Sequence, residues 1–277
     1  MTTNPEVIAP PAWSEPFQPD RRADLRRQGR VPIDRAAVFG KADGSGATVA
    51  IVDSGVDGGH PSVGGRLTRS VRVELHRDRT IVIEDNPIDV VGHGTACAGI
   101  VHALAPNADL VSVRVLGPDN RAQGIAFAAA LEWVVGQGIG IANLSLSSKR
   151  ESLFAAFHDL ADQAYFANIV LVGAANNLPG PSYPSLFASV VSVAAHDVPD
   201  PWTWFYNPTP PVEFGAWGVD VPVAWRDGGR IIATGNSFAA PHITGLAALL
   251  RSRNPDATPF EIKALLAATA TNALSGT

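Results

Sequence analysis

An uninterrupted apolar run that stops at a single carboxylate is the feature that most constrains how this chain can fold. Residues 47–52 read ATVAIV, and the next three are Asp53, Ser54 and Gly55. A strand without polar alternation is buried on both faces, as in a parallel sheet covered by helices. The sequence therefore predicts a buried strand with Asp53 at its carboxyl end.

Similar short apolar runs recur along the chain, and segments with helical periodicity separate them. The further predicted strands are residues 108–115, 139–144, 169–172 and 190–194. The predicted helices are residues 95–104, 123–135, 152–165, 238–250 and 259–268. This alternation predicts an α/β fold with three layers, a mostly parallel central sheet and helices on both faces. Functional side chains of such sheets gather at the carboxyl ends of the strands.

Two segments fall outside the alternating pattern. Residues 1–30 are rich in proline and arginine and predict an extended arm, with one short helix near residues 23–25. Residues 199–211 contain several aromatic and proline residues and predict an irregular surface loop. Because 46% of the 277 residues are hydrophobic, we expect residues 31–277 to form one large domain.

Charge and composition exclude several classes of partner. The net charge of -5 provides no basic field that would attract nucleic acid or an anionic membrane. The apolar stretch 238–250 is interrupted by Pro241 and His242 and is shorter than the roughly 20 residues of a membrane span. No basic and apolar secretory signal opens the chain, and Cys97 is the single cysteine. We therefore expect a cytoplasmic protein without disulfides, and its oligomeric state stays open.

Three side chains at predicted element ends form a nucleophilic set. Asp53 ends a strand, His93 opens a helix after Gly92, and Ser237 opens another after Gly235. A serine hydroxyl needs a neighbouring imidazole to take its proton, and the imidazole needs a carboxylate to fix its tautomer. Each residue alone also fits a capping or structural role.

The blocks around these residues resemble the signatures of one enzyme family. They read VAIVDSGVD at 49–57, GHGT at 92–95 and GNSFAAPH at 235–242. In this order they are similar to the Asp, His and Ser motifs of subtilisin-like serine peptidases, the subtilases. The resemblance extends from about residue 31 to the last predicted helix and implies the same three-layer fold. It also implies that Asp53 orients His93, that His93 is general base and then acid, and that Ser237 attacks the scissile carbonyl.

The same resemblance implies an oxyanion donor and a substrate cleft. The block VGAANN at 172–177 is similar to the family's oxyanion segment, with Asn176 as the side-chain donor and Asn177 as the alternative. The residues expected to bind substrate are Ser145, Leu146, Ser147, Gly173, Ala174 and Ala175. Because Ser147 and Ala175 stand where glycine is common, we expect a narrow primary pocket that favours small or medium residues.

Further departures from the family pattern leave the reacting atoms intact. Asn236 replaces a usual threonine, Phe238 a methionine and Ala96 a frequent histidine. No cysteine, histidine or carboxylate cluster with zinc spacing surrounds His60, His102 or His242. Cys97, four residues after His93, could be a reactive thiol or a metal ligand, but a small buried residue is the better interpretation. The chain runs from His93 through Leu104 directly to the next strand and leaves no room for the calcium loop that many secreted relatives insert into this helix. Ser62 stands where a carboxylate ligand would be. We therefore expect no metal and no cofactor.

The function implied is a serine endopeptidase that cleaves a peptide or protein substrate through an acyl-enzyme. Dedicated processing of one peptide or precursor fits a cytoplasmic enzyme better than general digestion. Two other functions stay open. A substrate amine in place of water would resolve the same acyl-enzyme by ligation or macrocyclisation. A catalytically silent peptide-binding module would keep the fold without turnover.

Overall fold

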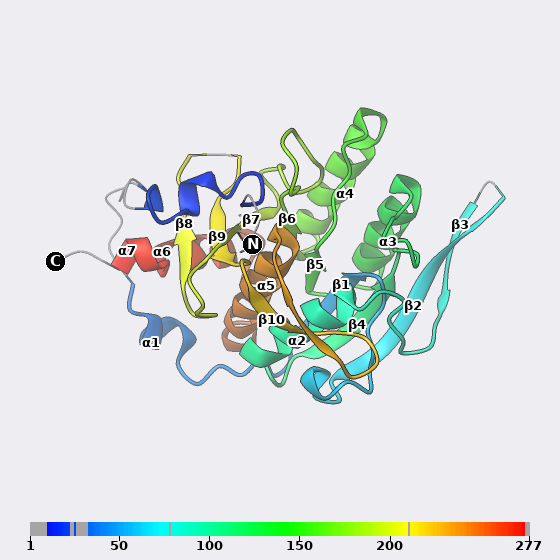
Figure 1. Cartoon of the computed structure of the whole chain (residues 1–277), viewed down its shortest axis with the longest axis horizontal. Coiled ribbons are helices and arrows are strands. Elements are labelled where there is room, and N and C mark those ends of the chain that lie inside the picture. The colour runs from blue at the N-terminus through cyan, green and yellow to red at the C-terminus, as the bar shows by residue number, and fades with distance from the viewer. Residues whose placement is uncertain (1–9, 23–24, 26–32, 78, 210, 275–277) are drawn as a thin grey trace, which may run out of the picture.

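A nine-stranded sheet forms the centre of the molecule in the computed structural model, which describes residues 10–22, 25, 33–77, 79–209 and 211–274 (Figure 1). The strand order is β3-β2-β4-β1-β5-β6-β7-β9-β8. Its parallel centre consists of β1 (Thr48–Asp53), β4 (Asp109–Arg114), β5 (Ile141–Leu144), β6 (Val170–Ala174) and β7 (Val191–His196). These are the five strands that the apolar runs predict.

Helices cover both faces of this sheet because β1 is apolar on both sides. Val49 and Ile51 belong to the core on one face, and Ala50 and Val52 to the core on the other. The first face packs against α2 (His93–Leu104), α5 (Asn236–Arg253) and α6 (Pro259–Ala268). The second packs against α3 (Gly124–Gly136) and α4 (Phe154–Phe166). The predicted three-layer α/β architecture is confirmed.

The edges of the sheet are antiparallel hairpins. β2 (Leu67–His76) runs parallel to β4 and pairs with β3 (Arg79–Glu84) in a long hairpin that projects from the body (Figure 1, cyan). At the other edge β9 (Phe214–Trp217) runs parallel to β7 and antiparallel to β8 (Trp204–Tyr206). A separate two-stranded sheet joins β10 (Val221–Ala224) and β11 (Arg230–Ala233).

Residues 199–211 are not the irregular surface loop that the sequence predicts. They contain β8, and Trp204 is fully buried against Phe39 of α1 (Arg35–Phe39). The indole N–H of Trp204 donates to the backbone oxygen of Leu266 at 2.8 Å, so burial leaves no polar atom of this ring unpaired. Packing within the domain accounts for this aromatic segment.

The described part of the predicted extended arm folds onto the domain. Residues Glu15–Phe17 form a 3-10 helix, η1, and the Phe17 ring is fully buried. The described residues 10–22 therefore pack against the domain, and the 3-10 helix replaces extended structure at residues 15–17. Ala23 and Asp24, on which the predicted short helix depends, lie outside the described residues.

The remaining short elements are η3 (Pro61–Val63), η4 (Glu151–Leu153) and α7 (Thr271–Leu274). Within the described ranges no helix has the length and apolar character needed to cross a membrane. The strands β1, β5 and β6 end close to the first turns of α2 and α5, on the side of the sheet where the parallel strands have their carboxyl ends. The predicted catalytic residues lie at these carboxyl ends.

Candidate active site

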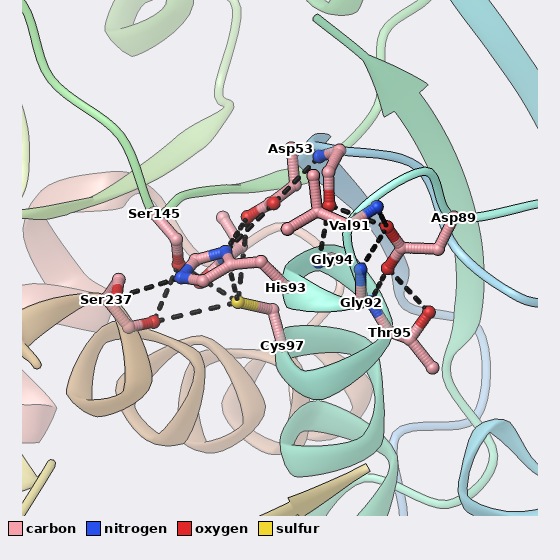
Figure 2. Close-up of polar contacts among 12 residues, drawn as sticks. Asp53, Asp89, Val91, Gly92, His93, Gly94, Thr95, Cys97, Ser145 and Ser237 are labelled. Carbon is pink, nitrogen blue, oxygen red and sulfur yellow. Dashed lines mark hydrogen bonds and ion pairs between the residues drawn. The ribbon is translucent and has the colours of Figure 1, made fainter. Parts of the chain in front are cut away.

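Asp53, His93 and Ser237 form one continuous chain of hydrogen bonds (Figure 2). His93 Nδ1 lies 2.9 Å from each Asp53 carboxylate oxygen, and His93 Nε2 lies 2.9 Å from Ser237 Oγ. The carboxylate can only accept, so Nδ1 carries the proton, and Nε2 is left to accept from the serine hydroxyl. The structure brings together the three residues that the motifs single out, in the geometry of general-base catalysis.

Gly92 and Gly94, which flank His93, allow the start of α2 to lie this close to the neighbouring segments. Gly94, the second residue of α2, lies so near β1 that an added Cβ would stand 2.0 Å from the backbone oxygen of Gly55. Gly92 has φ of 113°, a left-handed conformation, and an added Cβ would meet the Trp225 ring at 2.7 Å. Side chains at either position would displace His93 from Asp53.

The groups packed around His93 shift the pKa of its imidazole. Burial disfavours the imidazolium, but the Asp53 carboxylate and Cys97 together more than offset burial, and the pKa of His93 is raised well above its ordinary value. Asp53 is itself fully buried and accepts a hydrogen bond from the backbone N–H of Ser54 at 2.7 Å. The Phe238 ring lies 5.0 Å from the His93 ring, centroid to centroid, and shields it from solvent.

Asp89 holds the first turn of α2 and has no counterpart among the predicted site residues (Figure 2). One carboxylate oxygen accepts from the backbone N–H groups of Val91 (2.9 Å) and Gly92 (2.7 Å) and from Ser54 Oγ (2.7 Å). The other accepts from Thr95 through its backbone N–H and its hydroxyl, both at 2.7 Å. Asp89 therefore ties the turn that carries His93 to the loop after Asp53.

Beneath the nucleophile, a buried polar network links α5 to β5. Thr244 Oγ1 donates to Asn143 Oδ1 (2.9 Å), Asn143 Nδ2 donates to Ser145 Oγ (2.8 Å), and Ser145 Oγ donates to the backbone oxygen of Ser237 (2.9 Å). Ser145 thus anchors the first turn of α5, besides lining the cleft as predicted. The network fixes Ser237 relative to the sheet.

Cys97 lies beside the same network, one turn after His93 in α2. Its Sγ is 3.3 Å from Ser145 Oγ and 3.7 Å from Asp53 Oδ2, and burial raises the pKa of the thiol. Within the described part of the chain, Asp53, His93 and Cys97 are the one group of three potential ligands close enough to share a metal ion. Two of them belong to the hydrogen-bond chain with Ser237, so their positions are already explained without an ion.

Asn176 and Asn177 point in different directions, and Asn177 is the one beside Ser237. An added Cβ at Gly235 would stand 3.3 Å from Ser237 Oγ and 3.4 Å from Asn177 Nδ2. The amide oxygen of Asn177 accepts from the backbone N–H of Asn236 at 2.8 Å, which leaves its NH2 group toward Gly235. Asn176 instead donates from Nδ2 to Ser147 Oγ at 3.3 Å. Of the two predicted candidates for the oxyanion donor, the geometry favours the alternative, Asn177.

A cavity of about 520 Å³ opens beside Ser237 between the segments that follow β5 and β6. The predicted substrate-binding residues that line it are Ser145, Leu146, Ser147, Ala174 and Ala175. Gly173 does not, because it lies buried within β6 with Ser185 packed against it. The hydrogen bond between Asn176 and Ser147 joins the two walls. Two exposed cations, Arg121 and Arg150, also line the cavity and have no counterpart in the prediction.

Comparison with known proteins agrees with this geometry. Residues 44–277 match the model of the subtilase family. The chain is 33% identical over 242 residues to a thermostable alkaline protease of Halalkalibacterium halodurans, covering 82% of this chain and 63% of that protein. It thus spans less than two thirds of that relative's length. It is 32% identical to subtilisin BL of Lederbergia lenta, covering 83% of this chain and 85% of that protein.

The fold has solved counterparts. The crystal structure of a cold adapted subtilisin-like serine proteinase superposes with a TM-score of 0.67 at 28% identity, covering 87% of this chain and 88% of that one. The predicted fold and family are confirmed. With the family match, the sheet and the Asp53, His93 and Ser237 chain in agreement, this protein belongs to the subtilase family of serine peptidases.

Proposed function

We propose that this chain is a serine endopeptidase that hydrolyses peptide bonds through an acyl-enzyme. The hydrogen-bond chain from Asp53 through His93 to Ser237, open to a cavity of about 520 Å³, carries the proposal. A silent binding module would need none of this alignment. The names of the relatives, an alkaline protease and a subtilisin, support the same activity.

The geometry supports two acyl transfers with one base. His93 Nε2 accepts the proton of Ser237 Oγ as that oxygen bonds to the scissile carbonyl carbon, and then gives the proton to the leaving amine. The C–N bond breaks and leaves an ester on Ser237. Water attacks this ester, its proton passes to His93, and the acid is released as the proton returns to Ser237. Asp53 stays ionised and stabilises the imidazolium in both halves.

Two groups are placed to stabilise the oxyanion of each tetrahedral intermediate. Ser237 is the second residue of α5, an 18-residue helix, so its backbone N–H lies at the positive end of the helix dipole. The NH2 group of Asn177 approaches from the end of β6. A fixed donor aimed at developing charge acts mainly in the transition state. We assign this role to Asn177 in place of Asn176.

The substrate class proposed is an extended peptide or an unfolded precursor segment. Backbone groups along the cavity walls after β5 and β6 can pair with such a segment as an added strand. Dedicated processing of one peptide or precursor, in preference to general digestion, is part of this proposal. A cytoplasmic location, and a lack of nucleic-acid and membrane partners, remain part of this proposal.

Labelling and cleavage together test the activity. A fluorophosphonate probe should label the purified protein at Ser237, and a diverse peptide library should give cleavage products by mass spectrometry. Ser237→Ala should lose both signals, with turnover reduced by roughly 10⁶, a magnitude that comes from subtilisin itself. Product masses also separate hydrolysis, which adds one water across the cleaved bond, from ligation or macrocyclisation, in which an amine takes the place of that water and none is added. Labelling of Ser237 would exclude the silent module, and a protein that gives neither labelling nor cleavage products would refute the peptidase.

A further inference from the structure

The chain touches its own oxyanion site with a segment from the N-terminal arm. This segment, residues 11–17, is called the strap. The backbone N–H of Ala12 donates to the backbone oxygen of Asn177 at 2.9 Å. The backbone oxygen of Ala12 accepts from Asn236 Nδ2, also at 2.9 Å. Ala12 thus bridges the asparagine beside Ser237 and the residue that precedes Ser237.

The strap is anchored by burial as well as by these bonds. Phe17 is fully buried in a cluster with Ala175 and Ala194, at the carboxyl ends of β6 and β7. Its ring fills the space over Gly215, where an added Cβ would stand 2.5 Å from ring atoms. In Figure 1 this first described segment, in dark blue, lies beside β7, β8 and β9. Burial of this ring removes apolar surface from water and anchors the strap on the domain.

Asn236 connects the strap to the rest of the site. It is fully buried, and its Oδ1 accepts from the backbone N–H of Ala195 at 2.9 Å. Its Nδ2 donates to Ala12 and to the backbone oxygen of Ala175, at 3.1 Å in the second case. A threonine has one hydroxyl proton and could not serve all three partners at once. An asparagine at position 236 can therefore bond to the strap and to the ends of β6 and β7 at the same time.

The strap's backbone also borders the open surface beside the site. Pro10, Pro11 and Ala12 line a cavity of about 640 Å³ together with Asn177 and Leu178. Asn177 and Leu178 also line the cavity beside Ser237. The strap therefore lies on a surface that continues from the catalytic cleft.

We propose that the strap is a positioning element for catalysis: it holds Asn177 so that its NH2 group stays aimed at the oxyanion. The inference rests on the proposed peptidase activity. Asn177 is fixed from two sides, by Ala12 at its backbone oxygen and by Asn236 at its amide oxygen. Preorganised donors stabilise a transition state because they do not have to reorient during the reaction. A shift of about 1 Å in such a group can cost on the order of 10² in rate.

Two variants release the strap at different points. Phe17→Ala removes its anchor, and Ala12→Pro removes the N–H that donates to Asn177 while leaving the oxygen that accepts from Asn236. Arg21→Ala is the matched control, since it breaks only an exposed ion pair with Glu15 in the same arm. A short peptide with a small leaving group should be the substrate, so that few substrate atoms reach the strap. Fluorophosphonate titration gives the concentration of competent Ser237.

Each strap variant should lower kcat per titrated site about tenfold, part of the roughly 10²–10³ that a lost oxyanion donor costs. KM should change less than about threefold, and Arg21→Ala should match the parent. A merely structural role would lower the melting temperature and the titrated fraction but leave kcat per site at the parent value, and that result would overturn the proposal. Phe17→Leu should restore most of the rate.

A double-mutant cycle tests whether the strap acts through Asn177. In an Asn177→Ala background, Ala12→Pro should lower kcat less than about twofold further, because the group that it positions is gone. A full tenfold additional loss would show that the strap acts elsewhere. If the parent enzyme cleaves no peptide at all, the proposed function fails. If it cleaves and the strap variants keep its kcat, only the strap inference fails.

Discussion

Two adjacent asparagines at the end of β6 have side chains that serve different parts of the site. Asn177 contacts Asn236 and approaches Ser237, whereas Asn176 contacts Ser147 in the wall of the cavity. The motif VGAANN cannot separate them, because both are amides and both follow the strand. The choice depends on where β6 stops and how the chain turns, which packing against β7 and α5 decides. The triad, by contrast, could be predicted from its three motifs.

Substitution of each asparagine should separate their roles. Asn177→Ala should lower kcat by roughly 10²–10³ with a smaller change in KM, a range that comes from a subtilisin, because the lost donor acts in the transition state. Asn176→Ala should leave kcat within about threefold and change KM. Steady-state kinetics on one short peptide distinguishes the two variants. The reverse pattern would restore Asn176 as the donor.

The link between Asn176 and Ser147 should restrict the residue before the scissile bond. Both side chains occupy space between the cavity walls, and the hydrogen bond at 3.3 Å holds them there. The double variant with glycine at positions 147 and 176 should raise kcat/KM for phenylalanine relative to alanine at that substrate position, by about tenfold or more. Paired peptides that differ only there provide the measurement. Fast cleavage after phenylalanine by the parent enzyme would contradict a narrow pocket.

The raised pKa of His93 fixes the direction of the pH dependence. Only neutral His93 can take the proton of Ser237, so kcat/KM should fall as pH decreases through this pKa. Because Asp53 holds that pKa well above 6.5, the rising limb should lie on the alkaline side of an ordinary histidine. Asp53→Asn removes the charge, and it should move the limb to lower pH and cut kcat by about 10⁴. A pH profile of kcat/KM for both proteins checks this; a parent limb below pH 6.5 would contradict it.

At the level of elements, the fully buried parts of the fold could be predicted and the edges could not. The central strands can be recognised in the sequence as apolar runs because both of their faces are covered. The hairpin of β2 and β3 carries charged residues along its length, such as Arg72 and Glu74, and its pairing depends on a neighbouring strand. β8 is three residues long and is stabilised by its contact with β9. Single-strand patterns contain little of that information.

The turn before α2 provides a test at this scale. Asp89 accepts hydrogen bonds from the backbone of Val91, Gly92 and Thr95, and so satisfies donors at the start of the helix. Asp89→Ala should lower the free energy of unfolding by about 2–3 kcal/mol, because several donors to a charged acceptor lose their partner. It should also lower kcat, since the same turn carries His93. Urea unfolding and kinetics on the variant measure both effects, and a neutral result in both would exclude this role.

Across the whole molecule, two buried histidines make stability depend on pH. Burial lowers the pKa of His196 and of His242 to about 4. His196 is held in its neutral form, because Nδ1 accepts from the backbone N–H of Val198 and Nε2 then donates to the backbone oxygen of Thr203. The unfolded chain binds these protons near pH 6.5, so the native state loses stability as pH falls below that value.

The expected loss is on the order of 3 kcal/mol for each histidine between about pH 6.5 and 4. Urea unfolding at pH 7.5 and at pH 5 should show it. His196→Gln keeps one donor and one acceptor without a titrating group, and should reduce the difference between the two pH values. If that variant and the parent lose equal stability on acidification, the loss belongs to the carboxylates instead.

The hydrogen bond between Ala12 and Asn236 also constrains the order in which the site is assembled during synthesis. It closes a span of 224 positions, so the two partners become available to each other only after the residues between them have been synthesised. A ribosome-bound fragment that ends before α5 has neither Ser237 nor the Asn236 side chain that donates to Ala12. A chain that has made Ser237 still has to dock its earliest described residues before its oxyanion site is complete. On the proposed role of the strap, full hydrolytic competence would therefore be acquired only after this long-range contact has closed on the folded domain.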